Sequence, residues 1–151
     1  MKIKRLFKNI CFYACLFLPI YAKKNYLCKH QSLNSIQAMK TRSNTFIYES
    51  EKEWQPCEPG VCRQILGYDG QIMLVKVKFE TGACGNPHAH YHTQTTYVAA
   101  GKFEFTIGDE TKIVCAGDGL YMEPDIVHGC KCLEAGMLID TFSPMRESFL
   151  Q

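Results

Sequence analysis

Histidines and a glutamine recur at alternate positions in the second half of this chain. His88, His90, His92 and Gln94 are spaced by two residues, and His128 follows later, after a Gly-Asp-Gly turn and a proline. Imidazole nitrogens and a side-chain amide oxygen are ligands that first-row divalent metal ions accept. The pattern therefore predicts a metal centre that is built from uncharged donors.

Strand geometry would bring these donors to one point. Alternate side chains of a β-strand face the same side, so we expect His88, His90 and Gln94 to share one face of a strand. His128 would complete the ligand set from a strand that packs beside the first. Because four ligands are then supplied, we expect His92 to lie at the surface or to be a core histidine with satisfied hydrogen bonds.

The body of the chain has the pattern of short strands. From Phe46 onward no window sustains an apolar period of 3.6 residues, and turn sequences such as Gly108-Asp109-Glu110 recur about every ten residues. We expect strands over residues 72–79, 98–107 with a break at Gly101, 111–114, 120–122, 127–133 and 137–142. Closely spaced short strands of this kind predict an all-β barrel or sandwich.

Length and charge limit the classes of function. A chain of 151 residues with 46% hydrophobic residues suits a single domain with a buried core. Residues 1–38 contain seven Lys and Arg residues and no acidic residue, whereas all 15 Asp and Glu residues lie beyond them. The body is therefore net negative, which gives no electrostatic support for binding nucleic acid.

The first 38 residues need a separate interpretation. A basic start leads into an apolar run over residues 10–22, a span of 13 residues that is too short to cross a bilayer but long enough for a signal-peptide core. Two cysteines and a proline interrupt the run, and bulky Ile20 stands near the candidate cleavage position. Two interpretations stay open: a signal-like segment that exports the protein, or an extension ahead of a translation start at Met39.

Nine cysteines would suit a disulfide framework in a small secreted protein. The six that follow residue 38 show no Cys-x-x-Cys spacing, and several lie in apolar runs, as small buried residues do. We therefore expect free thiols in a reducing cytoplasm. Cys130 and Cys132 share the parity of His128, which leaves a thiolate ligand as the less favoured alternative.

The metal pattern resembles a known family. Residues 85–94, Gly-Asn-Pro-His-Ala-His-Tyr-His-Thr-Gln, with Gly101 beyond them, resemble the first cupin motif, and residues 117–124 followed by His128 resemble the second. A Glu is usual where Gln94 stands, and the Gln version is found in pectin-degradation cupins of the KdgF type. The similarity runs from about Tyr48 to Phe149. It implies a single small double-stranded β-helix, or jelly-roll barrel, over residues 39–151, and it favours an N-terminal extension over residues 1–38.

The resemblance also implies an activity and its residues. Cupins of this type convert cyclic 4,5-unsaturated uronates to the linear keto form, and the implied ligands of one divalent metal ion are His88, His90, Gln94 and His128. The family's acting residues fall on Asp140, Phe142 and Arg146. Their chemistry is suitable, because Asp140 could carry a proton and Arg146 has the fork geometry that recognises a carboxylate.

Two further residues are candidates for contacting the substrate. Thr96 stands where the family has another polar residue that touches the sugar, and Arg63 could line the mouth of the site.

Several alternatives stay open. The ion could be nickel, zinc, manganese or iron, since all accept these donors. The expected partner is a small anionic sugar, with no nucleic acid and no membrane partner for the cupin domain, and an exposed edge strand makes a homodimer plausible. An iron-dependent cupin dioxygenase and a non-catalytic sugar-binding cupin are the alternative functions. Asp140 argues against the pure binder, which needs no proton carrier.

Overall fold

The computed structural model describes residues 41–151. The leader expected over residues 1–38 lies outside the described residues. The elements in chain order are the 3-10 helix η1 (Glu49–Glu51), strands β1 (Gln55–Glu58), β2 (Val61–Tyr68), β3 (Met73–Phe79), β4 (Cys84–His88), β5 (Thr93–Ile107), β6 (Glu110–Cys115), β7 (Gly119–Met122) and β8 (His128–Ser143), and the 3-10 helix η2 (Glu147–Leu150). The described part of the chain contains no helix with the length and apolarity that a membrane crossing requires.

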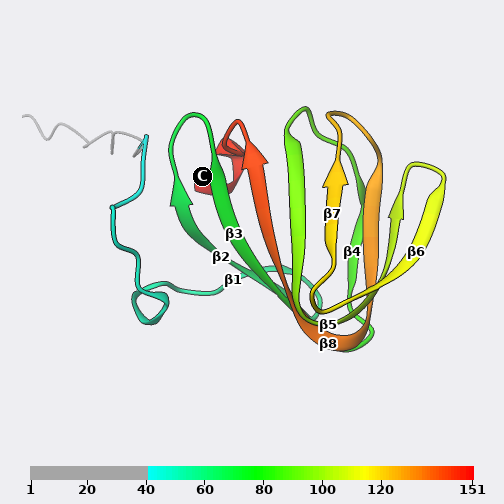
Figure 1. Ribbon diagram of the computed structural model, residues 1–151. Helices are drawn as coiled ribbons and strands as arrows, with labels where there is room; N and C mark the ends of the chain where they lie inside the picture. The colour runs from blue at the N-terminus through cyan, green and yellow to red at the C-terminus, as the bar shows by residue number, and fades with distance from the viewer. Residues whose placement is uncertain (1–40) are drawn as a thin grey trace, which may run out of the picture. The chain divides into compact units, whose positions relative to one another are not determined.

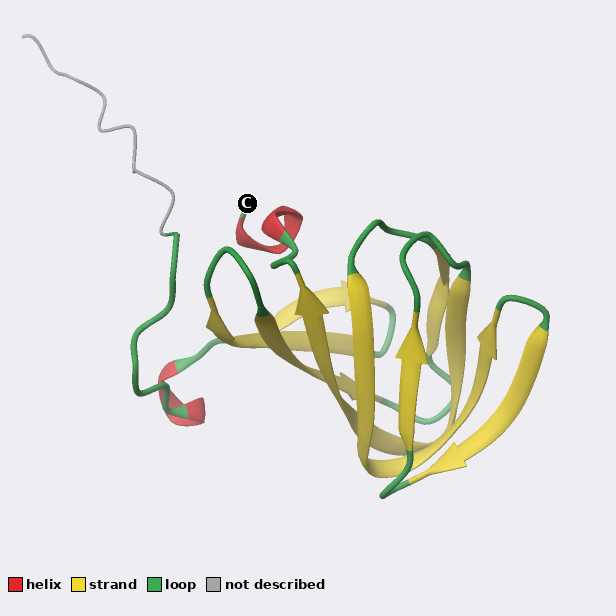
Figure 2. Ribbon diagram, turned by 45° about the horizontal axis from the view of Figure 1, so that its top comes forward, coloured by secondary structure: helices red, strands yellow, loops and turns green. Residues whose placement is uncertain are grey.

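The strands form one antiparallel system that folds into two facing layers. Its order is β1-β2-β3-β8-β5-β6, with β4 paired to β8 and β7 paired to β5. The two longest strands belong to both layers. The first half of β5 and the second half of β8 pair with each other beside β3 and β7, and their other halves pair beside β4 and β6. Figures 1 and 2 show β5 and β8 curving together from one layer into the other. The prediction of an all-β barrel is confirmed.

The strands β5 and β8 bend where the sequence suggested breaks. The expected interruptions at Gly101 and around Gly136 are wrong, because each strand continues through its glycine. Gly101 has φ +84°, and a Cβ there would lie 2.6 Å from the Cα of Gly136, so both bends need a residue without a side chain. The β5 register shifts at this bend, and the buried positions change from even to odd numbers.

Three strands were not expected from the pattern. These are β1, β2 and β4, whose exposed or mixed burial gives little alternation of apolar and polar residues. The remaining expected strands are present, although β5 begins at Thr93 rather than at residue 98 and β8 joins two predicted strands. Strands β1 and β2 carry polar residues on both faces, and in all three strands apolar and polar residues do not alternate clearly, so the sequence pattern predicted no strand there.

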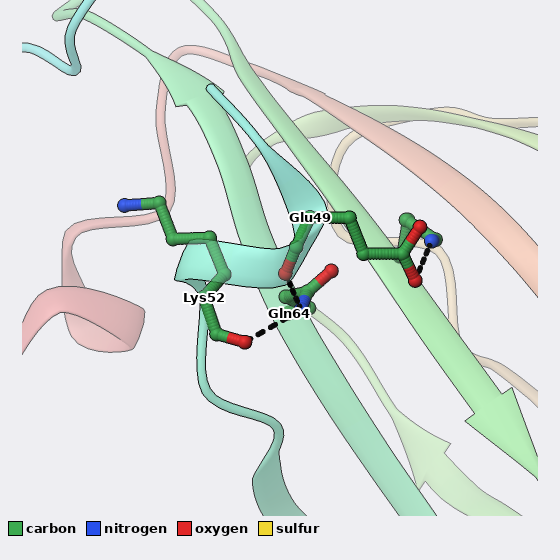
Figure 3. A network of polar contacts seen from close by, with 4 residues as sticks. Glu49, Lys52 and Gln64 are labelled. Atoms are coloured by element: carbon green, nitrogen blue, oxygen red, sulfur yellow. Dashed lines mark hydrogen bonds and ion pairs between the residues drawn. The ribbon is translucent and has the colours of Figure 1, made fainter.

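The segment before β1 is fixed to the outer side of the second strand. Gln64 is fully buried, and its Nε2 donates to the backbone oxygens of Glu49 (3.2 Å) and Lys52 (2.9 Å), as Figure 3 shows. Lys76 on β3 adds a 2.7 Å ion pair with Glu49. These contacts leave the inner face of β2, with Arg63, free to line the interior pocket.

Candidate metal centre and pocket

Three histidines from three different elements converge at one end of the barrel. His88 ends β4, His90 lies in the loop before β5, and His128 begins β8. The pairing of β4 with β8 sets His88 opposite His128, as the sequence suggested for neighbouring strands. The expectation that His88 and His90 share one strand is wrong, because β4 ends at His88 and the chain turns there.

The histidine rings are oriented as a metal site requires. The ligand atoms of His88, His90 and His128 all lie within 4.8 Å of one another. Nδ1 of His88 contacts the carbonyl of Asn86 at 2.8 Å, and Nδ1 of His128 contacts the carbonyl of Ile126 at 2.9 Å. A carbonyl can only accept, so each Nδ1 carries the proton and each Nε2 offers a lone pair, which is the arrangement found at metal-bound histidines.

Two histidines of this cluster have ring nitrogens whose hydrogen bonding is not satisfied within the described chain. Nε2 of His128 is buried and has no hydrogen-bond partner within residues 41–151. His90 contacts the carbonyl of His92 through Nδ1 at 3.2 Å and Oε1 of Gln94 through Nε2 at 3.0 Å. Both contacts are acceptors, and a neutral imidazole has only one proton for them. A positive ion beside these lone pairs would remove both mismatches, so the residues present fit a divalent metal.

Two of the imidazoles, those of His90 and His128, are held in the neutral form that binds metal. Burial lowers the pKa of His90 to about 4, with Arg146 and the neighbouring histidines adding to the shift. Burial also lowers the pKa of His128. Both rings are therefore neutral near neutral pH, so a metal would not have to displace a second ring proton from either of them.

Gln94 is oriented by a chain of hydrogen bonds that ends on a carboxylate. Its Nε2 donates to Oγ1 of Thr96 at 3.1 Å, and the Thr96 hydroxyl donates to Oδ1 of Asp140 at 2.6 Å. The hydroxyl group of Thr96 has one hydrogen, which it donates to the Asp140 carboxylate. Oγ1 of Thr96 therefore accepts the hydrogen bond from the amide nitrogen of Gln94. The amide oxygen is thereby turned toward His90 and the histidine cluster. Thr96 is not among the described residues that line the pocket.

Asp140 is a buried carboxyl group on the pocket wall. It lies on β8 opposite Thr96 of β5 and Val75 of β3. Burial raises its pKa to about 6, while hydrogen bonds from Thr96 and Gln94 and the charge of Arg146 oppose the rise. A carboxyl group with such a pKa can take up and release a proton close to neutral pH.

A pocket of about 360 Å³ joins these groups to a cationic wall. It is lined by His88, His128, Gln94, Asp140, Phe142 and Arg146, together with Arg63 of β2 and Phe149 of η2. Within residues 41–151 no carboxylate lies within ion-pair distance of either arginine. The guanidinium carbon of Arg63 lies 3.7 Å from the ring centroid of Phe149, and that of Arg146 lies 4.4 Å from it. Glu58 and Asp140 also line the pocket, but neither guanidinium group forms an ion pair in the described part of the chain, so this wall is suitable for an anion.

Phe149 is an aromatic pocket residue that the sequence did not indicate. It follows Arg146 by three residues in a short 3-10 helix, and nothing in the local pattern separates it from an ordinary apolar residue near a chain end. Its ring contacts Phe142 at a centroid distance of 5.6 Å, so it extends the aromatic wall beside Asp140.

His92 and Cys130 lie near the centre but outside the three-histidine group. His92 is buried, but neither ring nitrogen has a hydrogen-bond partner in the described chain, so the expectation of a surface histidine or a hydrogen-bonded core histidine is wrong. Cys130 lines the pocket, and burial raises the pKa of its thiol to about 12, so it stays protonated. The six cysteines in the described residues are all free thiols.

Sequence comparison finds a matching protein family and a similar protein. The family model described as "Cupin domain" matches residues 75–141. The chain is 41% identical over 107 residues to the pectin degradation protein KdgF of Dickeya dadantii (strain 3937), an alignment that covers 70% of this chain and 97% of that protein.

Solved structures agree with this placement. An RmlC-like cupin from Shewanella frigidimarina NCIMB 400 matches with a TM-score of 0.71 and 39% identity, covering 73% of this chain and 99% of that one. KdgF from Halomonas sp. matches with a TM-score of 0.67 and 36% identity, covering 71% and 99%. The barrel and the histidine cluster together define this protein as a cupin. The chain belongs, within the cupins, to the KdgF family.

Proposed function

We propose that this protein is a metal-dependent enzyme that opens cyclic 4,5-unsaturated uronates, derived from pectin, alginate or related polysaccharides, to their linear keto form. The observation that carries the proposal is a single pocket that is lined by uncharged metal donors, a buried carboxyl group and an arginine that forms no ion pair within the described residues. The name of the Dickeya relative, a pectin degradation protein, supports a uronate as the substrate.

His88, His90, Gln94 and His128 would hold one divalent ion, with nickel, zinc, manganese and iron as candidates. A bound ion would act as a Lewis acid that polarises an oxygen atom of the sugar. Because the four donors are uncharged, none of them would offset the positive charge of the site. This suits an anionic substrate better than a glutamate in place of Gln94 would.

The reaction is an isomerisation that needs a proton carrier. The ring carbon–oxygen bond of the hemiacetal breaks, the resulting enol becomes a ketone, and one proton leaves a hydroxyl oxygen while another arrives at a carbon. Asp140 would take the first proton and return one to the carbon, so that no oxidant or reductant is consumed. A pKa of about 6 allows the same carboxyl group to perform both transfers.

The arginine and aromatic groups would orient the sugar. Arg146 lines the pocket and would receive the substrate carboxylate through paired hydrogen bonds. Its guanidinium carbon lies 5.6 Å from the ring centroid of Phe142, and this ring would flank the sugar next to the carboxylate. Arg63, which donates from Nε to Oε1 of Gln55 at 3.2 Å, would add positive charge at the same wall.

The test is direct. Purified full-length protein is mixed with an unsaturated monouronate, and loss of absorbance from the conjugated double bond is followed before and after chelation and metal readdition. We expect decay faster than in buffer, loss with the chelator and recovery with metal. Decay no faster than in buffer would refute the proposal. Turnover that requires dioxygen would favour the dioxygenase, and binding without turnover would favour the sugar-binding cupin.

Two other expectations remain proposals. The homodimer predicted from the edge strands is tested by light scattering of the purified protein. The cytoplasmic location, with export as its alternative, is tested by fractionating cells that express the full chain.

A further inference from the structure

The short helix η2 follows immediately after Arg146, and its contacts decide where that arginine lies. Arg146 is the N-cap residue of η2, and the backbone N–H of Phe149 donates to the Arg146 carbonyl at 3.0 Å. A single turn of four residues has little stability of its own. Its position therefore depends on the side chains that tie it to the barrel.

The first tie reaches the loop before β5. The hydroxyl of Tyr91 donates to Oε2 of Glu147 at 3.2 Å, and the same oxygen lies 3.9 Å from Nε2 of His92. The Tyr91 and His92 rings are in contact, with centroids 3.9 Å apart and ring planes tilted by 30°. The Glu147 carboxylate thus lies next to this buried imidazole, whose two nitrogens have no hydrogen-bond partner within residues 41–151.

The second tie is aromatic. Phe149 contacts Phe142 of β8 and lies beside the guanidinium of Arg63 of β2. Together the two ties fix η2 at both ends, through Glu147 near its start and Phe149 near its finish. Arg146 stands just before them at the pocket wall.

The same loop also carries part of the metal centre. His92 presents its backbone carbonyl to Nδ1 of His90 at 3.2 Å, while its side chain faces Glu147. A shift of this loop would therefore move both a metal donor and the support of Arg146.

We propose that Tyr91, His92 and Glu147 form a clasp that positions Arg146 for the substrate carboxylate. The inference rests on the proposed function for its ligand. The three are positioning residues, because Glu147 acts through the neighbouring Arg146 and does not line the pocket in the described structure.

A kinetic cycle tests the clasp. Glu147→Ala and Tyr91→Phe are expected to raise KM for the unsaturated uronate by about 2- to 12-fold, the range for one hydrogen bond, with kcat changed less than twofold. The methyl ester of the substrate, which lacks the carboxylate charge, should show no such rise. In an Arg146→Ala background, Glu147→Ala should have no further effect on KM.

Matched variants separate positioning from general damage. Glu147→Gln keeps an acceptor for Tyr91, so its KM should be much closer to the wild-type value than that of Glu147→Ala. Glu134→Ala and Tyr121→Phe change exposed residues away from the pocket and should leave KM unaltered. An equal rise in KM for acid and ester, an additive effect with Arg146→Ala, or the same KM rise in Glu134→Ala would each overturn the proposal.

A substrate-free measurement keeps the clasp separate from the activity. The Phe149 amide reports on η2 through its bond to Arg146, so its hydrogen exchange should be faster in Glu147→Ala and Tyr91→Phe than in wild type. If wild type turns over no uronate, the proposed function fails while faster exchange still supports the clasp. Unchanged exchange overturns the clasp whatever the activity.

Discussion

The hydroxyl of Thr96 donates a 2.6 Å hydrogen bond to Oδ1 of Asp140, across the paired strands β5 and β8. This bond joins the two functional halves of the pocket. On one side Thr96 orients the amide of Gln94, and on the other it stabilises the ionised form of the carboxyl group that we propose as the proton carrier. The candidate metal donor Gln94 and the proposed proton carrier Asp140 are thus held by one hydroxyl.

Thr96→Val should therefore weaken metal binding. Without the hydroxyl, Nε2 of Gln94 loses its acceptor on Thr96, and the amide can turn its oxygen away from His90. Loss of such an outer hydrogen bond typically lowers metal affinity by about 10- to 100-fold. Competition titration with a chromophoric chelator measures the change. Thr96→Ser keeps the hydroxyl and should bind within a few-fold of wild type, and a Thr96→Val protein with unaltered affinity would contradict the orienting role.

Asp140→Asn should abolish turnover while leaving the pocket intact. The amide cannot accept and return a proton, and removal of a general acid–base group costs about 100- to 10,000-fold in rate. Uronate binding, followed by calorimetry, should persist because Arg146 is still present. A variant that retains more than about a tenth of wild-type kcat would show that another group moves the proton.

The same carboxyl group makes the stability of the metal-free protein depend on pH. Its pKa is raised from 3.8 to about 6 by burial, so ionisation is harder in the folded than in the unfolded state. The contribution of protonated Asp140 is complete below pH 4 and is lost as pH rises through 6, amounting to about 3 kcal/mol. Urea unfolding of chelated wild type and Asp140→Asn between pH 4 and 7 measures this loss. As pH rises, the free energy of unfolding of the wild type should decrease relative to that of the variant. Parallel curves would mean that the carboxyl group is not desolvated.

Gly136→Ala tests the crossing of the two long strands. An added Cβ would overlap the carbonyl oxygen of Ala100 and approach the Cα of Gly101 to 2.8 Å, and backbone atoms cannot move away cheaply. We expect a loss in the free energy of unfolding of at least about 3 kcal/mol, or failure to fold. Gly70→Ala is the control, since its Cβ would meet no atom within 4 Å and should change stability by less than about 0.5 kcal/mol. Equal stability of the two variants would refute the packing argument.

Residue types and local periodicity were enough to predict the strand-rich barrel and the donors of the candidate site. Alternation in the last long strand correctly put Asp140 and Phe142 on one face, and both line the pocket. Local patterns succeeded here because side-chain direction along one strand depends only on residue parity. They failed for His90, where the chain turns after His88 and parity no longer applies.

Contacts between segments that are distant in the sequence could not be predicted from local patterns. The Thr96–Asp140 bond joins residues 44 positions apart, and the Tyr91–Glu147 bond joins residues 56 positions apart. Both depend on the strand register and on the bend where Gly101 meets Gly136, which packing of the whole barrel determines. The amino-acid order specifies which donors, acids and bases exist and which face of a strand they take. Their meeting at one pocket requires the complete fold, since no local preference encodes a distance across it.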